Sequence, residues 1–322
     1  MEDLLAALKA AAEPTRLRLL SLLEYNELTV SELTQILGQS QPRVSRHLKL
    51  MAEAGLVERF SEGTWAFYRV ADRPLGRTLV RAIADLIDGD DPVMARDMER
   101  LEQVKAARAE AAAAYFSENA AIWDTIRSLY MPEAEVEKAI LELLGGGPIG
   151  KLLDIGTGTG RILSILSPQI ERGLGIDANR EMLAVARANL DLAQIQNCQV
   201  RLGDMYHLGL PSAEVDLAVI HQVLHFAEEP STAVQEAARV VRPDGRLLIV
   251  DFAPHQLEYL RTEHAHRRLG FGDDEVAGYC RAAGFDDVAV RHLVGGELTV
   301  TLWLAGRRER GAVPLQRVGE RA

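Results

Sequence analysis

The feature that most constrains the fold of this chain is a glycine-rich loop. It lies between a segment with the apolar pattern of a strand and a segment with the pattern of a helix. Residues 152–161 read LLDIGTGTGR, and from residue 151 onward the order strand, turn, helix recurs. The pattern predicts strands at 151–155, 173–177, 199–202, 215–221 and 246–251, then an antiparallel pair at 287–293 and 298–305. Strands that alternate with helices indicate a parallel sheet covered on both faces. We therefore expect a doubly wound, Rossmann-like α/β domain with a seven-stranded sheet.

The loop itself indicates what kind of ligand it can hold. Gly156, Gly158 and Gly160 permit a tight turn and a close approach of a ligand to the backbone. A dinucleotide-binding loop would have a further glycine where Arg161 stands. With Asp154 ahead of the glycines, the pattern fits a ligand with a cationic end better than a pyrophosphate. A glycine loop by itself can also be only a turn.

Acidic residues follow the next two predicted strands. Asp177 ends the second strand and can accept hydrogen bonds from both hydroxyls of a ribose, while Asn179 is placed to cap the helix that contains Met182. Asp204 follows the third strand and can take an adenine amino group, with Met205 packing on the ring. Each acid alone is more often an ordinary loop residue. Together they lie at successive carboxyl ends of strands, where open sheets bind ligands.

This part of the chain, about residues 115–305, resembles the class I S-adenosylmethionine-dependent methyltransferases. Residues 240–247 (VVRPDGRL) are similar to that family's turn into its fifth strand, and residues 216–225 to its fourth strand and following loop. The resemblance is greatest to small-molecule methyltransferases of the ubiquinone-biosynthesis type and to bacterial fusions with an ArsR head. It implies that residues 115–124 cover the cofactor. It also implies cofactor contacts from Asp154, Gly156, Gly158, Gly160, Asp177, Met182, Asp204 and Met205.

The methyl acceptor is less well defined by the sequence. His221 and His225 can act as general bases if the acceptor is a hydroxyl or an acidic C–H group. Packed or loop histidines are the plainer interpretation. We expect no metal site from His264 and His266, because side chains two residues apart on a helix diverge. The fourth strand is not followed by an asparagine-proline-proline-aromatic sequence, which argues against methylation of adenine in DNA.

The first seventy residues predict short helices followed by a hairpin. Thr29 and Glu32 form a capping box, and Gly38 supplies the stop of that helix. Pro14 opens an earlier helix, and Ser40 is expected to cap the next one. Residues 56–70 then give two strand patterns around a turn signal. This order indicates a helix-turn-helix with a wing, an α+β domain.

One helix of this region has the character of a DNA-reading helix. Val44, Leu48 and Met51 share one face, whereas the cations lie on the opposite face and no acid occurs between residues 39 and 52. Such a helix suits the major groove, where arginine reads guanine and lysine meets phosphate. A solvated basic face is the alternative. We expect DNA contacts from Ser40, Gln41, Arg43, Arg46 and Lys49, and from Arg59 in the wing.

Residues 4–70 resemble the ArsR/SmtB winged-helix repressors, on residues 8–20, 27–33 and 40–55. The resemblance implies a homodimer that binds an inverted repeat in double-stranded operator DNA. Metal-sensing members have two cysteines where this chain has Thr29 and Ser31, so soft thiolate ligation is impossible there. Residues 72–91 also lack the histidines of a second metal site. We therefore expect no metal and a different effector.

Composition supports this division of the chain. The net charge of −11 does not exclude DNA binding, since basic and acidic side chains balance in residues 1–80 and the excess acidity lies beyond them. No apolar run is long enough for a bilayer, the first residues carry acids, and Cys198 and Cys280 cannot form a disulfide framework. We expect a cytoplasmic protein without a membrane partner.

We expect a winged-helix domain at 1–91, a linker helix at 92–115, a methyltransferase domain at 116–306 and a disordered tail at 307–322. Met94, Met98, Leu101 and Val104 recur every three or four residues. The spacing fits a strut or a dimer seam as well as a linker helix packed against the second domain.

Two functions remain open at this point. In the first, a non-metal-sensing regulator carries a domain that methylates an unidentified small molecule. In the second, the domain binds S-adenosylmethionine or S-adenosylhomocysteine only as an effector, and the protein represses methionine-cycle genes. An oxidoreductase that uses a nicotinamide cofactor is the remaining alternative.

Overall fold

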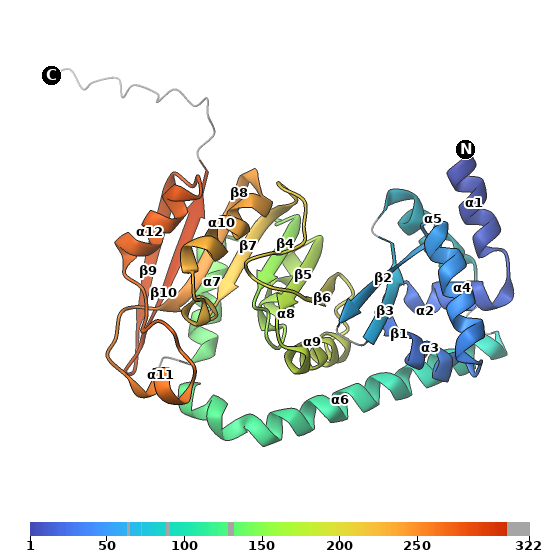
Figure 1. The fold of residues 1–322 in the computed structure, drawn as a ribbon, viewed down its shortest axis with the longest axis horizontal. Coiled ribbons are helices and arrows are strands. Elements are labelled where there is room, and N and C mark those ends of the chain that lie inside the picture. The colour runs from blue at the N-terminus through green and yellow to red at the C-terminus, as the bar shows by residue number, and fades with distance from the viewer. Residues whose placement is uncertain (63–64, 72, 88–90, 128–131, 308–322) are drawn as a thin grey trace, which may run out of the picture. The chain divides into compact units, whose positions relative to one another are not determined.

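The computed structural model describes residues 1–62, 65–71, 73–87, 91–127 and 132–307 (Figure 1). Within these ranges, the side chains of residues 61–65 and 112–131 are not described. The chain forms two compact units. The first contains residues 1–118, 158–160 and 179–202, and the second contains 119–157, 161–178 and the chain from 203 onward. Among the described residues, no helix is long and apolar enough to cross a membrane.

The winged helix is present in the first unit as predicted. Its elements are α1 (Glu2–Ala11), α2 (Pro14–Leu23), β1 (Leu28–Thr29), α3 (Val30–Leu37), α4 (Gln41–Glu53), β2 (Val57–Glu62), β3 (Trp65–Val70) and α5 (Pro74–Leu86). The three strands form an antiparallel sheet in the order β1-β3-β2. Buried leucines of α2 and α3 and the apolar face of α4 form one core.

Local signals at the helix ends explain these boundaries. The Thr29 side chain accepts the Glu32 N–H and the Glu32 carboxylate accepts the Thr29 N–H, which confirms the capping box. Gly38 ends α3 with φ of 63°, a conformation that favours glycine. Ser40 takes the N-cap position of α4, but its side chain makes no capping hydrogen bond. The prediction that its hydroxyl caps this helix is therefore wrong.

Helix α6 (Pro92–Arg127) runs well beyond residue 115, where we expected it to end. Its residues 112–127 continue the alanine-rich sequence without a glycine or proline to stop the helix. Leu101 and Val104 are buried in the winged-helix core, and Arg18 donates hydrogen bonds to the buried Asp97 at 2.5 and 2.7 Å. The apolar stripe of this helix is thus mostly covered within the first unit, and it is not an open seam.

The predicted seven-stranded sheet is also confirmed. The strands are β4 (Lys151–Ile155), β5 (Arg172–Asp177), β6 (Cys198–Leu202), β7 (Val215–His221), β8 (Val241–Phe252), β9 (Asp287–Val294) and β10 (Thr299–Gly306), in the order β6-β5-β4-β7-β8-β10-β9. Strand β4 pairs parallel to β5 and β7, and β7 pairs parallel to β8. Strand β10 pairs antiparallel to β8 and β9, as expected for the closing pair.

Helices cover the faces of this sheet and leave the carboxyl ends of its strands for a ligand. They are α7 (Glu133–Leu144), α8 (Arg161–Leu166), α9 (Arg180–Leu192), α10 (Pro230–Val240) and α12 (Asp273–Ala282). The short helix α11 (Tyr259–Glu263) and 3₁₀ turns at Ser167–Gln169 and Leu224–Phe226 lie in the connections. Helices α10 and α12 pack together on β7–β10, while α8 packs on β4 and β5 (Figure 1). The carboxyl ends of the parallel strands remain as the place for a ligand. The tail expected to be disordered lies outside the described residues from 308 onward.

Candidate cofactor site and DNA-reading face

The glycine loop begins where β4 ends, and two backbone bonds hold its start. The N–H groups of Gly156 and Thr157 donate to the Ile176 carbonyl of β5 at 2.7 and 3.0 Å. Gly156 has φ of +71°, and a Cβ there would lie 2.5 Å from a methyl group of Val223. Only glycine fits this position, because the conformation and the space both exclude a side chain.

The other two loop glycines belong to the first unit. Both have positive φ, +52° at Gly158 and +77° at Gly160. A Cβ at Gly160 would lie 3.3 Å from Cβ of Ala186, so α9 packs closely there. A Cβ at Gly158 would meet no described atom within 4 Å. The loop therefore has the backbone conformation of a ligand cradle, with open space at Gly158.

Asp154 is the most unusual polar residue of the second unit. Its side chain is 1% exposed, and Oδ2 accepts a hydrogen bond from the Thr157 hydroxyl at 2.6 Å. Oδ1 is buried and has no hydrogen-bond partner among the described residues. Burial and the nearby Asp177 carboxylate raise the pKa of Asp154, the Thr157 hydrogen bond opposes them, and the result is a pKa of about 7. An unsatisfied buried oxygen is costly, so this one fits a ligand with a cationic donor.

The remaining predicted acids lie at the neighbouring strand ends. The Gly203 N–H donates to the Asp177 carbonyl at 2.9 Å, which brings the ends of these two segments together. Asp204 is exposed and accepts the Tyr206 N–H at 3.0 Å, and Met205 packs against the domain core. Their placement fits ribose and adenine contacts, and those roles stay predictions.

Met182 lies on α9 in the first unit, where the Asn179 side chain accepts its N–H at 3.1 Å. This confirms the predicted N-cap of α9. The segment 115–124, expected to cover the cofactor, is helical, and its side chains from 112 onward lie outside those described.

Of the two histidines singled out as bases, His225 has the more specific environment. Its Nδ1 lies 2.8 Å from Oδ1 of Asp251, and its N–H donates to Oδ2 at 3.1 Å. Asp251 is fully buried at the end of β8 and was missed by sequence reasoning. The only available signal was an acid in the apolar strand sequence LLIVDF. His221 is half-buried, and burial lowers its pKa to about 4, so it is neutral at physiological pH.

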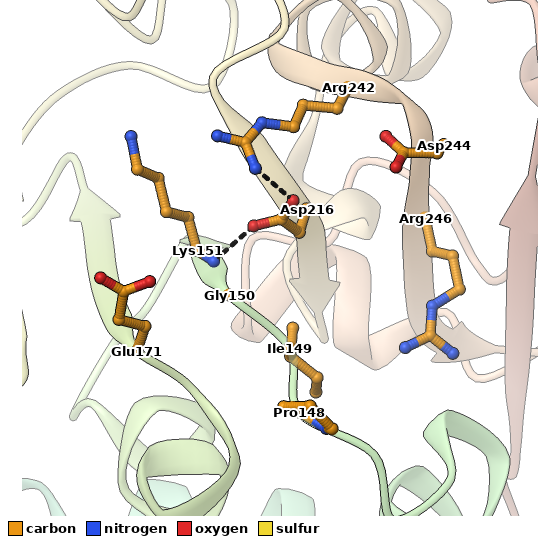
Figure 2. A pocket seen from close by; sticks show the side chains of 9 residues that line it. All are labelled: Pro148, Ile149, Gly150, Lys151, Glu171, Asp216, Arg242, Asp244 and Arg246. Atoms are coloured by element: carbon orange, nitrogen blue, oxygen red, sulfur yellow. Dashed lines mark hydrogen bonds and ion pairs between the residues drawn. The ribbon is translucent and has the colours of Figure 1, made fainter.

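A hollow of about 380 Å³ lies at the opposite edge of the sheet, where the strands begin. Figure 2 shows that Asp216 accepts the backbone N–H of Lys151 at 2.6 Å and the guanidinium of Arg242 at 2.5 Å. Asp216 is thus already engaged within the hollow, and none of the predicted site residues lines it. The predicted site residues lie at the carboxyl edge instead, and their roles stay predictions.

The exposed face of α4 has the predicted cations. Arg43 and Arg46 are exposed, and their guanidinium groups make no hydrogen bond or ion pair with another described residue, while Lys49 has a weak pair with Glu53 at 3.9 Å. Ser40, Gln41 and Arg59 are also exposed. Val44, Leu48 and Met51 are completely buried on the opposite face. Arg69, at the end of the predicted wing, is buried and paired with Glu27 and Glu58, so it is not available to DNA.

Comparisons with known proteins identify this N-terminal part. Residues 13–59 match the family described as bacterial regulatory protein, arsR family. An uncharacterized HTH-type transcriptional regulator of Methanocaldococcus jannaschii is 38% identical over 81 residues, which are 25% of this chain and 85% of that protein. The chain belongs to the arsR family of bacterial regulatory proteins.

Residues 153–249 match a methyltransferase domain. An uncharacterized methyltransferase of Bacillus subtilis is 33% identical over 105 residues, 32% of this chain and 42% of that protein. An arsenite methyltransferase of Halobacterium salinarum is 29% identical over 103 residues, 31% of this chain and 26% of that protein. The chain thus spans less than half the length of these two methyltransferase relatives. This arsR-family chain therefore carries a methyltransferase domain with the class I fold.

Proposed function

We propose that this protein is a DNA-binding transcription regulator whose second domain transfers a methyl group from S-adenosylmethionine to a small molecule. The observation that carries the second half is the buried, unpartnered Oδ1 of Asp154 beside the glycine loop. S-adenosylmethionine has a cationic ammonium group and supplies an electrophilic methyl group on a sulfonium. In this proposal Asp154, Gly156, Gly158 and Gly160 hold the methionine end. Asp177 holds the ribose, and Met182, Asp204 and Met205 surround the adenine.

The DNA-binding half of the proposal is supported by α4. Arginines that face solvent without partners are available to guanine edges, and a lysine on the same face is available to phosphate. Arg59, exposed on β2, is placed to act from the wing. Activity on chromosomal DNA would require the protein to work in the cytoplasm.

Helix α1 supports a homodimer. Met1, Leu4, Leu5 and Leu8 are all exposed, by 92%, 38%, 48% and 43%, and lie at the i, i+3, i+4, i+7 spacing of one helical face. A second copy of this chain would cover that apolar stripe. The two-fold symmetry would then place two α4 helices on an inverted repeat.

The two cysteines argue against arsenite as the methyl acceptor. Arsenic is thiophilic and requires accessible thiolates. Cys198 and Cys280 are both buried, and burial raises the pKa of Cys280 to about 12. Neither thiol is accessible, so we expect an acceptor of another class.

A sensor that responds to S-adenosylmethionine or S-adenosylhomocysteine is the second candidate function. It is favoured by an ion-pair network in the first unit, where Glu27 pairs with Arg69 at 3.1 Å and with Arg187 of α9 at 3.6 Å. Arg69 also hydrogen-bonds to Gln199 of β6, and Arg187 stacks on the Phe67 ring at 4.3 Å. Helix α9 starts three residues after Asp177, so a ligand held there would act on the winged helix through this network as well as through α6.

Two measurements on the full chain test these functions. Selection from random DNA identifies the operator, which is then titrated without ligand, with saturating S-adenosylmethionine and with saturating S-adenosylhomocysteine. Coupling of about 1–3 kcal/mol would shift operator affinity five- to 150-fold. Three superimposable curves would reject the sensor, and calorimetry with no binding of either ligand would reject the cofactor assignment. If NADH bound instead, the oxidoreductase alternative would return.

A further inference from the structure

A second group of unsatisfied polar atoms lies near the glycine loop. Three imidazoles gather around the Phe252 ring, with centroid distances of 5.5 Å to His225 and 6.2 Å to each of His255 and His266. The rings of His225 and His266 stack at 4.0 Å. We call these three histidines and Asp251 the histidine cluster. All of its members belong to the second unit.

The cluster adjoins the methyl-donor end of the proposed cofactor site. A Cβ added to Gly156 would meet the side chain of Val223, which therefore lies directly against the loop. His225 follows two residues later, in the 3₁₀ turn Leu224–Phe226. The backbone carbonyl of His225 accepts the N–H groups of Arg267 and Arg268 at 3.0 and 3.1 Å, which fixes the turn.

Hydrogen bonds define how His225 can act. Asp251 is fully buried and accepts at Oδ1 from the Phe252 N–H at 2.8 Å as well as from His225. A carboxylate that accepts the Nδ1–H of an imidazole leaves Nε2 with its lone pair available. No described residue is hydrogen-bonded to Nε2 of His225. The arrangement is therefore that of a positioned base, with Asp251 as its positioning residue.

The other two histidines present polar atoms that nothing satisfies. His255 accepts the Leu257 N–H at Nδ1, 3.3 Å away, so the neutral ring has its proton on Nε2. That Nε2 is buried and has no partner among the described residues. His266 is 2% exposed and its buried Nδ1 is also without a described partner. Burial lowers the pKa of both, to about 3 for His266, so both rings are neutral.

We propose, resting on the proposed methyltransferase function, that the histidine cluster binds the methyl acceptor and that His225 takes its proton. The geometry points to an acceptor with a weakly acidic hydroxyl, a phenol or an enol. A hydroxyl has one donor and two acceptor sites, so it satisfies a base at His225 and a donor at His255 together. A carboxylate would be repelled by Asp251 and needs no base, and a thiol is too weak a hydrogen-bonding partner for these buried atoms.

The step balances without another reactant. The acceptor oxygen forms a bond to the methyl carbon, the carbon–sulfur bond breaks, and its electron pair stays on sulfur to give S-adenosylhomocysteine. The hydroxyl proton moves to Nε2 of His225, where Asp251 stabilises the imidazolium, and it then passes to water. His255 and His266 orient the acceptor and carry no proton in this step.

The test supplies the full chain with methyl-labelled S-adenosylmethionine and three hydroxyl compounds: phenol, catechol and the enol of 1,3-cyclohexanedione. Aniline and thiophenol are the matched amine and thiol. We expect label transfer to the hydroxyl series alone. Binding of each compound is also measured by calorimetry in the presence of S-adenosylhomocysteine. Transfer only to aniline or thiophenol, or neither transfer nor binding for the whole hydroxyl series, overturns the proposal.

Variants then separate chemistry from folding. His225→Ala should lower kcat by about 100- to 10,000-fold, as loss of a general base does, and added imidazole should restore part of it. Asp251→Asn should lower kcat with little change in KM, and His255→Gln and His266→Gln should raise KM. The control is His292→Gln. His292 is an exposed residue of β9 that lies outside the cluster, and like His225 it is hydrogen-bonded to an aspartate, Asp273, at 3.0 Å.

Equal kcat values in His225→Ala and His292→Gln, or no rescue by imidazole, would contradict the role of His225 as the general base. Calorimetry with S-adenosylmethionine alone keeps the two proposals apart. If the wild-type chain does not bind this cofactor, the proposed function fails. If it binds the cofactor and the His225 variant keeps full activity, only the acceptor proposal fails.

Discussion

The exposed face of α4 and the carboxyl edge of the large sheet both present polar groups without protein partners, but at different energetic cost. Arg43 and Arg46 face solvent, where water satisfies a charged guanidinium. Oδ1 of Asp154 and Nδ1 of His266 are buried, where each unsatisfied atom costs about 1–3 kcal/mol. An exposed charge is therefore compatible with a plain solvated surface. A buried polar atom without a partner indicates a ligand that replaces the hydrogen bond to water that burial removed.

The largest effect is expected from Asp154→Asn, which removes the charge of the buried carboxylate. A charged hydrogen bond is worth about 1.5–3 kcal/mol, so binding of S-adenosylmethionine should weaken about 10- to 150-fold. The pKa of Asp154 is about 7 in the fold against an ordinary value of 3.8, so the wild type loses stability as pH rises between these two values, and the full loss is present above pH 7. The asparagine variant should therefore melt at a higher temperature than the ligand-free wild type at about pH 8. Calorimetry and thermal melts measure both effects.

The control is Glu171→Gln, an exposed residue at the opposite edge of the same sheet. It should change neither property. Unchanged affinity in the Asp154 variant would remove the argument from the buried oxygen.

Arg43→Ala and Arg46→Ala test the exposed face. Each should weaken operator binding by about 1–3 kcal/mol, five- to 150-fold, at fixed salt, because each would lose a base or phosphate contact. Neither should change the melting temperature much, since neither side chain packs in the core. Arg96→Ala, an exposed arginine on α6, is the control. Full operator affinity in both α4 variants would show that this face is only solvated.

The affinity for S-adenosylmethionine should depend on pH through Asp154. Below its pKa of about 7 the carboxyl group holds a proton that must leave before it pairs with an ammonium group. Affinity should therefore rise up to about tenfold per pH unit between about pH 5 and 7 and level off above. Calorimetry in two buffers of different ionisation enthalpy would detect the released proton. If affinity did not change with pH, or changed equally in Asp154→Asn, Asp154 would not be the cause of the pH dependence.

Lys49→Ala should have the smallest effect. A phosphate contact is independent of base sequence, so operator and random DNA should weaken by similar factors. The slope of log affinity against log salt should fall by about one. A selective loss for the operator would instead indicate that Lys49 reads a base.

How far the sequence predicts each element depends on how local its cause is. Strands β4 and β7 begin and end at the predicted residues, and the capping box of α3 is present, because alternation, caps and glycines act within a few residues. The end of α6 was predicted too early, since alanine gives no stop signal. The Ser40 cap failed because a side chain at an N-cap position can still turn to solvent.

The sequence by itself determined the two domain families, the exposed and buried faces of α4, and the strand ends that bear Asp154, Asp177 and Asp204. These follow from periodicity and from the rule that parallel strands meet at one edge. Only the tertiary structure decided that Asp251 holds His225 and that His255 and His266 join them. Asp251 lies on β8 and His225 in a 3₁₀ turn 26 residues earlier in the chain, and a hydrogen bond between such distant segments depends on packing that no local pattern encodes. Burial, the cause of the raised pKa of Asp154, is likewise a property of the folded whole.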